Sequence, residues 1–160
     1  MKQNSIIFLD FDGVITNVQS RFKLNKKKLD LLGQIIDTTN CSLVISSSWR
    51  KNTIKDTIKY LSDDSQFFMN GMKFPFCDRI IGVTDRLAYE NEKTGYWEYK
   101  KRGEEIKKWI NDNSFTGNYV IIDDDHDFLD EQVPYCVFTH PLDGIDKNDV
   151  EKVIQILNKE

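Results

Sequence analysis

The chain has 160 residues and a net charge of -4, and 39% of its residues are hydrophobic while 30% are charged. This balance is typical of a soluble globular protein, and we expect a single domain over residues 1–160. The acidic balance argues against a general nucleic-acid binder. No apolar run approaches the roughly 20 residues that a membrane span needs.

The cysteines and the N-terminal residues bear on the compartment. Cys41, Cys77 and Cys136 are odd in number and lack the spacing of a metal site. No signal peptide is visible, because Lys2 precedes only a short apolar strand core. We therefore expect reduced thiols, a cytoplasmic location and no membrane partner.

The first predicted element is a strand that ends in two carboxylates. Four apolar residues, Ile6–Leu9, predict a strand buried on both faces, as in parallel sheets. Asp10 and Asp12 follow at alternate positions, so in an extended chain both side chains point to the same side. Two carboxylates about 4 Å apart repel by roughly 4 kcal/mol at an effective dielectric constant of about 20, which predicts a cation between them. Oxygen ligands in such a sparse set favour Mg²⁺.

A helix and a second buried strand follow. Asn25 is placed to cap a helix whose apolar residues at positions 29, 32, 35 and 36 form one stripe. The run Ser42–Ile45 predicts the strand, which ends in serines 46–48. A serine cluster after a strand is most often turn and cap chemistry, but after the acidic pair of the first strand we favour a functional role.

Trp49 and Arg50 come directly after these serines, and we expect them to open a helix that ends near Leu61. Arg50 has the chemistry to contact a substrate phosphate. For Trp49, stacking on a base and packing in the core both remain open.

Residues 62–101 are the least regular part of the chain, and we interpret them as an irregular insert or small lid within the domain. Residues 79–84 predict one strand inside it. The polar segment 85–101 contains four aromatic residues, Tyr89, Tyr96, Trp97 and Tyr99. Of a substrate-facing loop or lid and an ordered surface loop that packs its aromatic residues, we favour the second.

The last third of the chain repeats the opening pattern. Ile106, Trp109 and Ile110 form an apolar helical stripe after a basic segment. The buried strand 119–122 then runs into four carboxylates within five residues, at positions 123, 124, 125 and 127. Such a cluster beside an apolar strand is hard to explain unless a cation binds there. A short strand over 135–139 and a helix capped by Asp146 complete the pattern.

Five apolar strands alternate with helices, and three of the strands end in acids or hydroxyls. This alternation predicts a doubly wound, Rossmann-type α/β fold with a five-stranded, mainly parallel sheet between two helical layers. The insert is too small for an independent cap, so we expect a capless α/β/α domain or one with a minimal insert.

The sequence resembles the haloacid dehalogenase (HAD) superfamily of phosphotransferases in four segments. The run from Asp10 to Val14 resembles the first motif, and Ser46, with Ser47 as the alternative, resembles the second. The remaining two motifs are matched by Arg102, with Lys101 as the alternative, and by the pair Asp123 and Asp124. A narrower resemblance, which rests on residues 46–50, 102–109 and 123–125, is to the compact HAD domains of Swiss Army Knife RNA-repair proteins.

The resemblance implies a phosphatase that depends on Mg²⁺ and forms an aspartyl-phosphate intermediate. Asp10 would be the nucleophile, and Asp12 would be the general acid and then the base. Ser46 and Arg102 would hold the phosphoryl oxygens.

The resemblance also implies a ligand set for the metal. Asp10, the backbone carbonyl of Asp12, and Asp124 would bind Mg²⁺, while Asp123 would orient the basic residue or a metal-bound water. Asp127 matches a later acidic position that supports the site from further out.

From these features we expect a phosphomonoester hydrolase. Its substrate would be a phosphorylated small molecule such as a nucleotide, or the 3′ or 5′ phosphate end of a polynucleotide. The sequence gives no sign of an obligate protein partner. The alternative is a catalytically weak HAD-like module that binds phosphate and Mg²⁺ for regulation.

Overall fold

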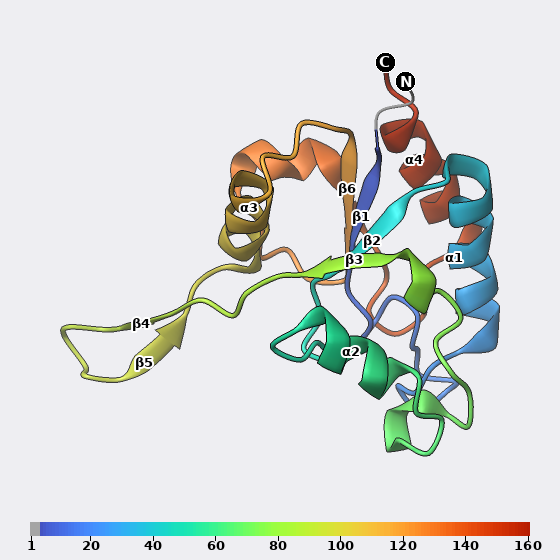
Figure 1. The fold of residues 1–160 in the computed structure, drawn as a ribbon, viewed down its shortest axis with the longest axis horizontal. Helices are drawn as coiled ribbons and strands as arrows, with labels where there is room; N and C mark the ends of the chain where they lie inside the picture. The colour runs from blue at the N-terminus through green and yellow to red at the C-terminus, as the bar shows by residue number, and fades with distance from the viewer. Residues whose placement is uncertain (1–3) are drawn as a thin grey trace.

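The computed structural model describes residues 4–160, and its main feature is a five-stranded sheet (Figure 1). All paired strands in this sheet are parallel, and their order is β3-β2-β1-β6-β7. The strands are β1 (Ile6–Leu9), β2 (Ser42–Ile45), β3 (Ile80–Val83), β6 (Tyr119–Asp123) and β7 (Cys136–Phe138). The order and direction confirm the predicted Rossmann-type α/β fold.

Helices cover both faces of the sheet. They are α1 (Lys26–Thr39), α2 (Ile54–Leu61), α3 (Arg102–Asp112) and α4 (Lys147–Leu157). In Figure 1, α1 and α4 lie on one side of the sheet and α3 on the other. The strand side chains divide in the same way, because alternate residues point to opposite faces. Ile7 and Leu9 belong to the apolar cluster that includes α1 and α4, whereas Ile6 and Phe8 pack with Ile106 of α3.

Two helices begin where their capping residues predict. The Asn25 side chain accepts a hydrogen bond from Lys28 N, and α1 starts at the residue after Asn25. Asp146 and Asp149 form a reciprocal capping box at the start of α4. These local hydrogen bonds satisfy backbone N–H groups that a helix start otherwise leaves unpaired.

Helix α2 begins later than expected, at Ile54 and not at Trp49. Thr53 is its N-cap and accepts a hydrogen bond from Asp56 N. The preceding residues form turns instead, in which Ser47 Oγ accepts from Trp49 N and Ser47 O accepts from Arg50 N. This loop turns both large side chains into the protein, where both are buried.

Residues 62–101 contain β3 of the main sheet and a separate hairpin that extends from the body of the domain (Figure 1). The hairpin pairs β4 (Ala88–Glu90) with β5 (Trp97–Tyr99) in antiparallel fashion. The expectation that this segment packs its aromatic residues is wrong, because Trp97 is 72% exposed and Tyr99 is 76% exposed. A two-stranded sheet has no second layer against which to bury them.

Shorter elements complete the fold. The 3₁₀ segments are η1 (Phe67–Met69), η2 (Cys77–Arg79) and η3 (Asp130–Tyr135). The three cysteines form no disulfide. Within residues 4–160, every helix is too short or too polar to cross a lipid bilayer.

Phe8 of β1 tests how much the fold depends on the central strand. Its ring is fully buried and makes edge-to-face contacts with Trp109 and Tyr119. Phe8→Ala is expected to lower the free energy of unfolding by about 3–5 kcal/mol, since it leaves a cavity. The matched control Phe67→Ala removes a ring that is 69% exposed, and we expect it to cost less than about 1 kcal/mol. Urea unfolding measures both values, and an equal loss in the two variants would contradict this assignment of the core.

Candidate active site

Parallel pairing brings the ends of three strands to one edge of the sheet. Leu9 pairs with the last residue of β2 and with Ile122 of β6. Ser46 N then donates to Leu9 O at 3.0 Å, and Asp10 N donates to Ile122 O at 3.0 Å. These bonds place Asp10, Ser46 and Asp123 side by side, although they come from segments far apart in the sequence.

A cluster of three carboxylates forms at this edge. Asp10, Asp123 and Asp124 each offer one oxygen, and these oxygens all lie within 4.8 Å of one another. Asp10 and Asp123 are buried, and Asp124 is partly exposed. Oxygen ligands in this arrangement suit Mg²⁺, which takes a few carboxylates and keeps waters or phosphate oxygens in its other positions. The donor set therefore fits the metal that the sequence predicts.

Gly13 makes room for one of these carboxylates. A Cβ atom at this position would lie 2.3 Å from Asp124 Oδ2, which is far inside van der Waals contact. The residue also has φ +72°, a conformation that side chains disfavour. Thr139 Oγ1 donates to Gly13 O at 2.6 Å and fixes the turn. Gly13, which belongs to the first HAD-like segment, is therefore needed to leave room for Asp124 of the fourth segment.

Arg102 is the cation of the cluster. Its Nη1 lies 3.1 Å from Asp10 Oδ1 and 2.9 Å from Asp123 Oδ2. The backbone N–H of Arg102 donates to Asp127 Oδ2 at 3.1 Å, so Asp127 anchors the start of α3 and with it the guanidinium. Lys101, the alternative considered for this role, is exposed and lines a separate cavity beside the hairpin.

The charges of the cluster are not balanced by Arg102 alone. Burial raises the pKa of Asp10 well above its usual value, and Asp123 raises it further, while Arg102 opposes both effects. Burial likewise raises the pKa of Asp123 to about 6, although the charge of Arg102 lowers it. Burial works against the charged form of Arg102, but Asp10 and Asp123 outweigh it and raise its pKa. An additional cation would therefore stabilise the ionised carboxylates.

Ser46 places its hydroxyl in the interior, directly after β2. The residue is 1% exposed, and its Oγ has no hydrogen-bond partner among residues 4–160. Buried hydroxyls are rarely left unpaired, and each one calls for an explanation such as a missing ligand. The alternative, Ser47, uses its Oγ to accept from Trp49 N. The structure therefore favours Ser46 as the group that meets a ligand oxygen.

Asp12 lies beside this cluster and is held by Trp49. Trp49 Nε1 donates to both carboxylate oxygens of Asp12 at 3.1 Å. Burial raises the pKa of Asp12, and the hydrogen bond from Trp49 works against that rise. The Trp49 ring is 8% exposed and packs on Phe11 and Phe68. Of the two roles left open for Trp49, the structure supports packing in the core, and it adds a hydrogen bond that the sequence did not reveal.

Arg50 is placed differently from the substrate contact expected for it. Its Nη2 lies 3.1 Å from Glu105 Oε1, and both side chains are more than nine-tenths buried. Its Nε donates to Thr84 O and its Nη1 to Ser47 O, each at 2.7 Å. These donors are used inside the protein, so Arg50 ties the serine loop to the end of β3 and to α3. We correct its role from phosphate contact to structural support.

A cavity of about 480 Å³ opens beside Asp12. Aromatic side chains and one lysine surround it, and its lining consists of Asp12, Phe22, Ser48, Trp49, Lys51, Tyr60 and Phe68. Among these residues, the sequence predicted an individual role only for Asp12 and Trp49, and it included Ser48 in the serine cluster. Phe22 and Phe68 belong to segments without helical or strand periodicity, so no sequence pattern pointed to them.

Together, the strand order and the groups at the sheet edge define a HAD-like domain. An acid follows β1, acids end and follow β6, a hydroxyl follows β2, and a cation opens α3. The sequence model of the HAD domain in Swiss Army Knife RNA repair proteins matches residues 6–150, and the chain belongs to this family. No curated protein and no solved structure matches the chain.

Gly13→Ala tests whether Asp124 belongs to a metal site. The variant forces the Asp124 carboxylate aside, so we expect the dissociation constant for Mg²⁺ to rise at least about tenfold. Gly71→Ala is the matched control, because Gly71 also has φ +72° but a Cβ there would meet nothing within 4 Å. Both variants should lose about 1–2 kcal/mol of stability from backbone strain. Calorimetric titration with Mg²⁺ measures the difference, and equal affinities in the two variants would contradict the assignment.

Proposed function

We propose that this chain is a phosphomonoester hydrolase that depends on Mg²⁺ and works through an aspartyl-phosphate on Asp10. Its substrate would be a nucleotide or a polynucleotide with a 3′ or 5′ phosphate end. One observation carries the proposal: nucleophile, hydroxyl and cation converge at the same edge of the sheet, where Asp10, Ser46 and Arg102 meet. Membership of a HAD family supports phosphatase chemistry.

The carboxylates of Asp10, Asp123 and Asp124 are the groups that would hold Mg²⁺. When bound, the ion supplies positive charge that offsets both the carboxylates and the phosphoryl group. Arg102 and the Ser46 hydroxyl are placed to bind the remaining phosphoryl oxygens. The free cysteines agree with a reducing, cytoplasmic setting.

The chain's own residues account for both halves of the reaction. A carboxylate oxygen of Asp10 attacks phosphorus, and the bond between phosphorus and the ester oxygen breaks. Asp12 donates a proton to that oxygen, and the alcohol leaves. Asp12, now ionised, then accepts a proton from the water that hydrolyses the aspartyl-phosphate, which releases phosphate and restores Asp10.

The cavity beside Asp12 indicates what kind of alcohol leaves. It adjoins the proposed proton donor, so it lies on the side of the leaving group. Phe22, Tyr60 and Phe68 offer aromatic surface on which a base can stack. The base of a nucleoside therefore suits this cavity.

Asp10→Asn tests the nucleophile. We expect Mg²⁺-dependent hydrolysis of p-nitrophenyl phosphate to fall at least about a thousandfold, because the amide is not a nucleophile for phosphorus. Asp125→Asn is the control, since this neighbouring acid is exposed and lies outside the carboxylate cluster. Turnover with Mg²⁺ and with a chelator gives the rates, and circular dichroism checks the fold. Retained turnover in Asp10→Asn would refute the assignment, while a wild-type protein that binds Mg²⁺ and phosphate without turnover would favour a regulatory module.

Trp49→Phe tests whether Trp49 positions Asp12 for proton donation. A poor leaving group such as an alkyl alcohol needs the proton, whereas p-nitrophenolate leaves without it. The variant keeps an aromatic ring but loses the N–H that binds Asp12. We expect the kcat for an alkyl phosphate, relative to that for p-nitrophenyl phosphate, to fall about tenfold. An equal loss on both substrates would indicate that Trp49 acts only through the packing of the core.

A further inference from the structure

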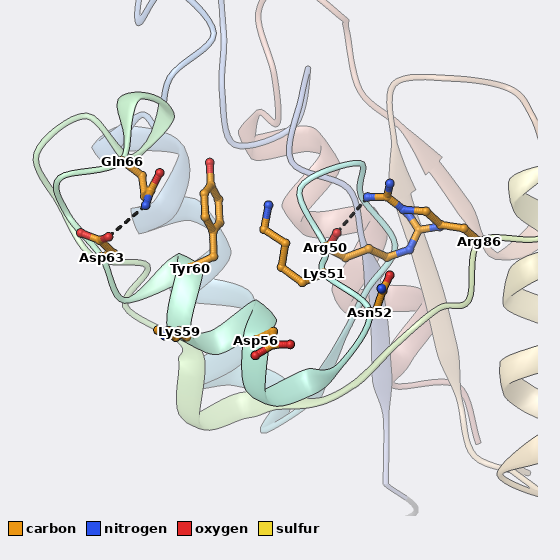
Figure 2. A pocket seen from close by; sticks show the side chains of 9 residues that line it. All are labelled: Arg50, Lys51, Asn52, Asp56, Lys59, Tyr60, Asp63, Gln66 and Arg86. Atoms are coloured by element: carbon orange, nitrogen blue, oxygen red, sulfur yellow. Dashed lines mark hydrogen bonds between the residues drawn. The ribbon is translucent and has the colours of Figure 1, made fainter.

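A groove leads from Asp12 along the start of α2. The cavity of about 480 Å³ beside Asp12 shares Lys51 and Tyr60 with a second cavity of about 560 Å³, shown in Figure 2. A third cavity of about 370 Å³ shares Lys51 and Arg86 with the second. Lys51 borders all three, so the groove runs from the proposed leaving-group site past Lys51 to Arg86.

Arg86 is a fixed cation in this groove. Its Nη2 donates to Ser48 O and to Arg50 O, each at 2.9 Å. These carbonyls belong to the loop that also carries Ser46, so the position of the Arg86 guanidinium is fixed relative to the reaction centre. Its Nε and Nη1 make no hydrogen bond to any group of residues 4–160. The guanidinium keeps donors available for an anion.

Lys51 is the second cation. Its Nζ lies 4.2 Å from the centre of the Tyr60 ring, between Tyr60 and Arg86 in Figure 2. Within the described residues, neither Lys51 nor Arg86 forms a salt bridge with a carboxylate. Because both cations border the same two cavities and neither is paired with a carboxylate, they form a local positive site in an acidic protein.

Two acids also border the second cavity and limit the extent of the positive site. Asp63 lies beside Gln66 at the far end of the view in Figure 2, and its carboxylate accepts hydrogen bonds from Ser65 and Gln66. Asp56 lies in the first turn of α2. Asp85 borders the third cavity next to Arg86, but its carboxylate is paired with Lys108 at 2.9 Å. The groove is therefore positive from Lys51 to Arg86 and not along its whole length.

We propose that Lys51 and Arg86 bind a second phosphate of the substrate, namely the phosphodiester that follows the terminal nucleotide. This second site rests on the proposed phosphatase function and narrows the class of substrate that the phosphatase accepts. The aromatic cavity takes the terminal nucleoside, and the chain of the nucleic acid leaves this cavity past Lys51. Lysine and arginine together suit a phosphodiester, one as a point charge and the other through its forked donors. The preferred substrate is then a single-stranded oligonucleotide with a terminal phosphate, in preference to a mononucleotide.

Substrate selectivity tests this site directly. The kcat/KM values for a nucleoside monophosphate and for a trinucleotide with the same terminal phosphate are compared, with 3′ and 5′ phosphates in turn. In Lys51→Gln the ratio of trinucleotide to mononucleotide is expected to fall about tenfold, which corresponds to the loss of one charge-assisted contact. Lys55→Gln is the matched control, because Lys55 is also exposed and lies in the first turn of α2, close to Lys51 in the sequence, but borders none of the three cavities. The ratio of kcat/KM for the trinucleotide to that for the mononucleotide in Lys55→Gln should equal the wild-type ratio.

A binding measurement separates this proposal from the phosphatase proposal. Fluorescence anisotropy of a labelled trinucleotide without a terminal phosphate reports binding to the nucleoside cavity and the second site without the reaction centre, with the Asp10→Asn protein as the background. Lys51→Gln added to this background is expected to weaken binding about tenfold and to flatten its dependence on salt. If Lys51→Gln weakens binding but the wild-type protein hydrolyses no substrate, the phosphatase proposal would be overturned and the second site would remain supported. Unchanged binding and an unchanged selectivity ratio would overturn the second site and leave the phosphatase intact.

Discussion

The site depends on the register in which β1 pairs with β2 and β6. Three carboxylates would not gather around one point unaided, because their mutual repulsion and their burial both oppose it. The strands hold them there, since β1 is fully buried on both faces and bonded to a strand on each side. A slip of one residue would turn Asp10 to the other face of the sheet and remove it from Asp123. The apolar run Ile6–Leu9 therefore fixes the chemistry as well as the core.

Polar contacts between side chains fix the position of the loops that lie outside the sheet. The buried pair of Arg50 and Glu105 joins the serine loop to α3, and Leu87 N donates to the same carboxylate at 2.9 Å. Such a pair is weak evidence for net stability, because desolvation offsets the attraction, but breaking it leaves a buried charge. We interpret it as a constraint on geometry, which sets the distance between the end of β2 and the start of α3. Ser46 lies directly after β2 and Arg102 lies at the start of α3, so the buried pair also fixes the distance between Ser46 and Arg102.

Much of this arrangement follows from local sequence patterns. Strands in a parallel sheet are apolar throughout, so Ile6–Leu9 and Ser42–Ile45 were predicted with their observed bounds, and the capping residues Asn25 and Asp146 marked two helix starts. Acids directly after such strands must lie at one edge, which is why the cluster was foreseen.

The remainder depends on tertiary contacts that have no local signature. Whether a side chain after a strand turns inward or outward depends on partners elsewhere, and the partners of Arg50 and Trp49 are Glu105 and Asp12. The sequence did not predict the hairpin, because each of its strands has only 3 residues, which is too short for a periodic pattern to stand out. The position of Asp12 between the carboxylate cluster and the aromatic cavity was likewise invisible in the sequence. In the proposed phosphatase, the groups that act on the phosphoryl group lie at the sheet edge, whereas the cavity residues Phe22, Tyr60 and Phe68 come from a loop, α2 and η1. In that phosphatase, substitutions in these segments would alter which alcohol is accepted without moving a strand, so the leaving group could vary while the phosphoryl chemistry stays fixed.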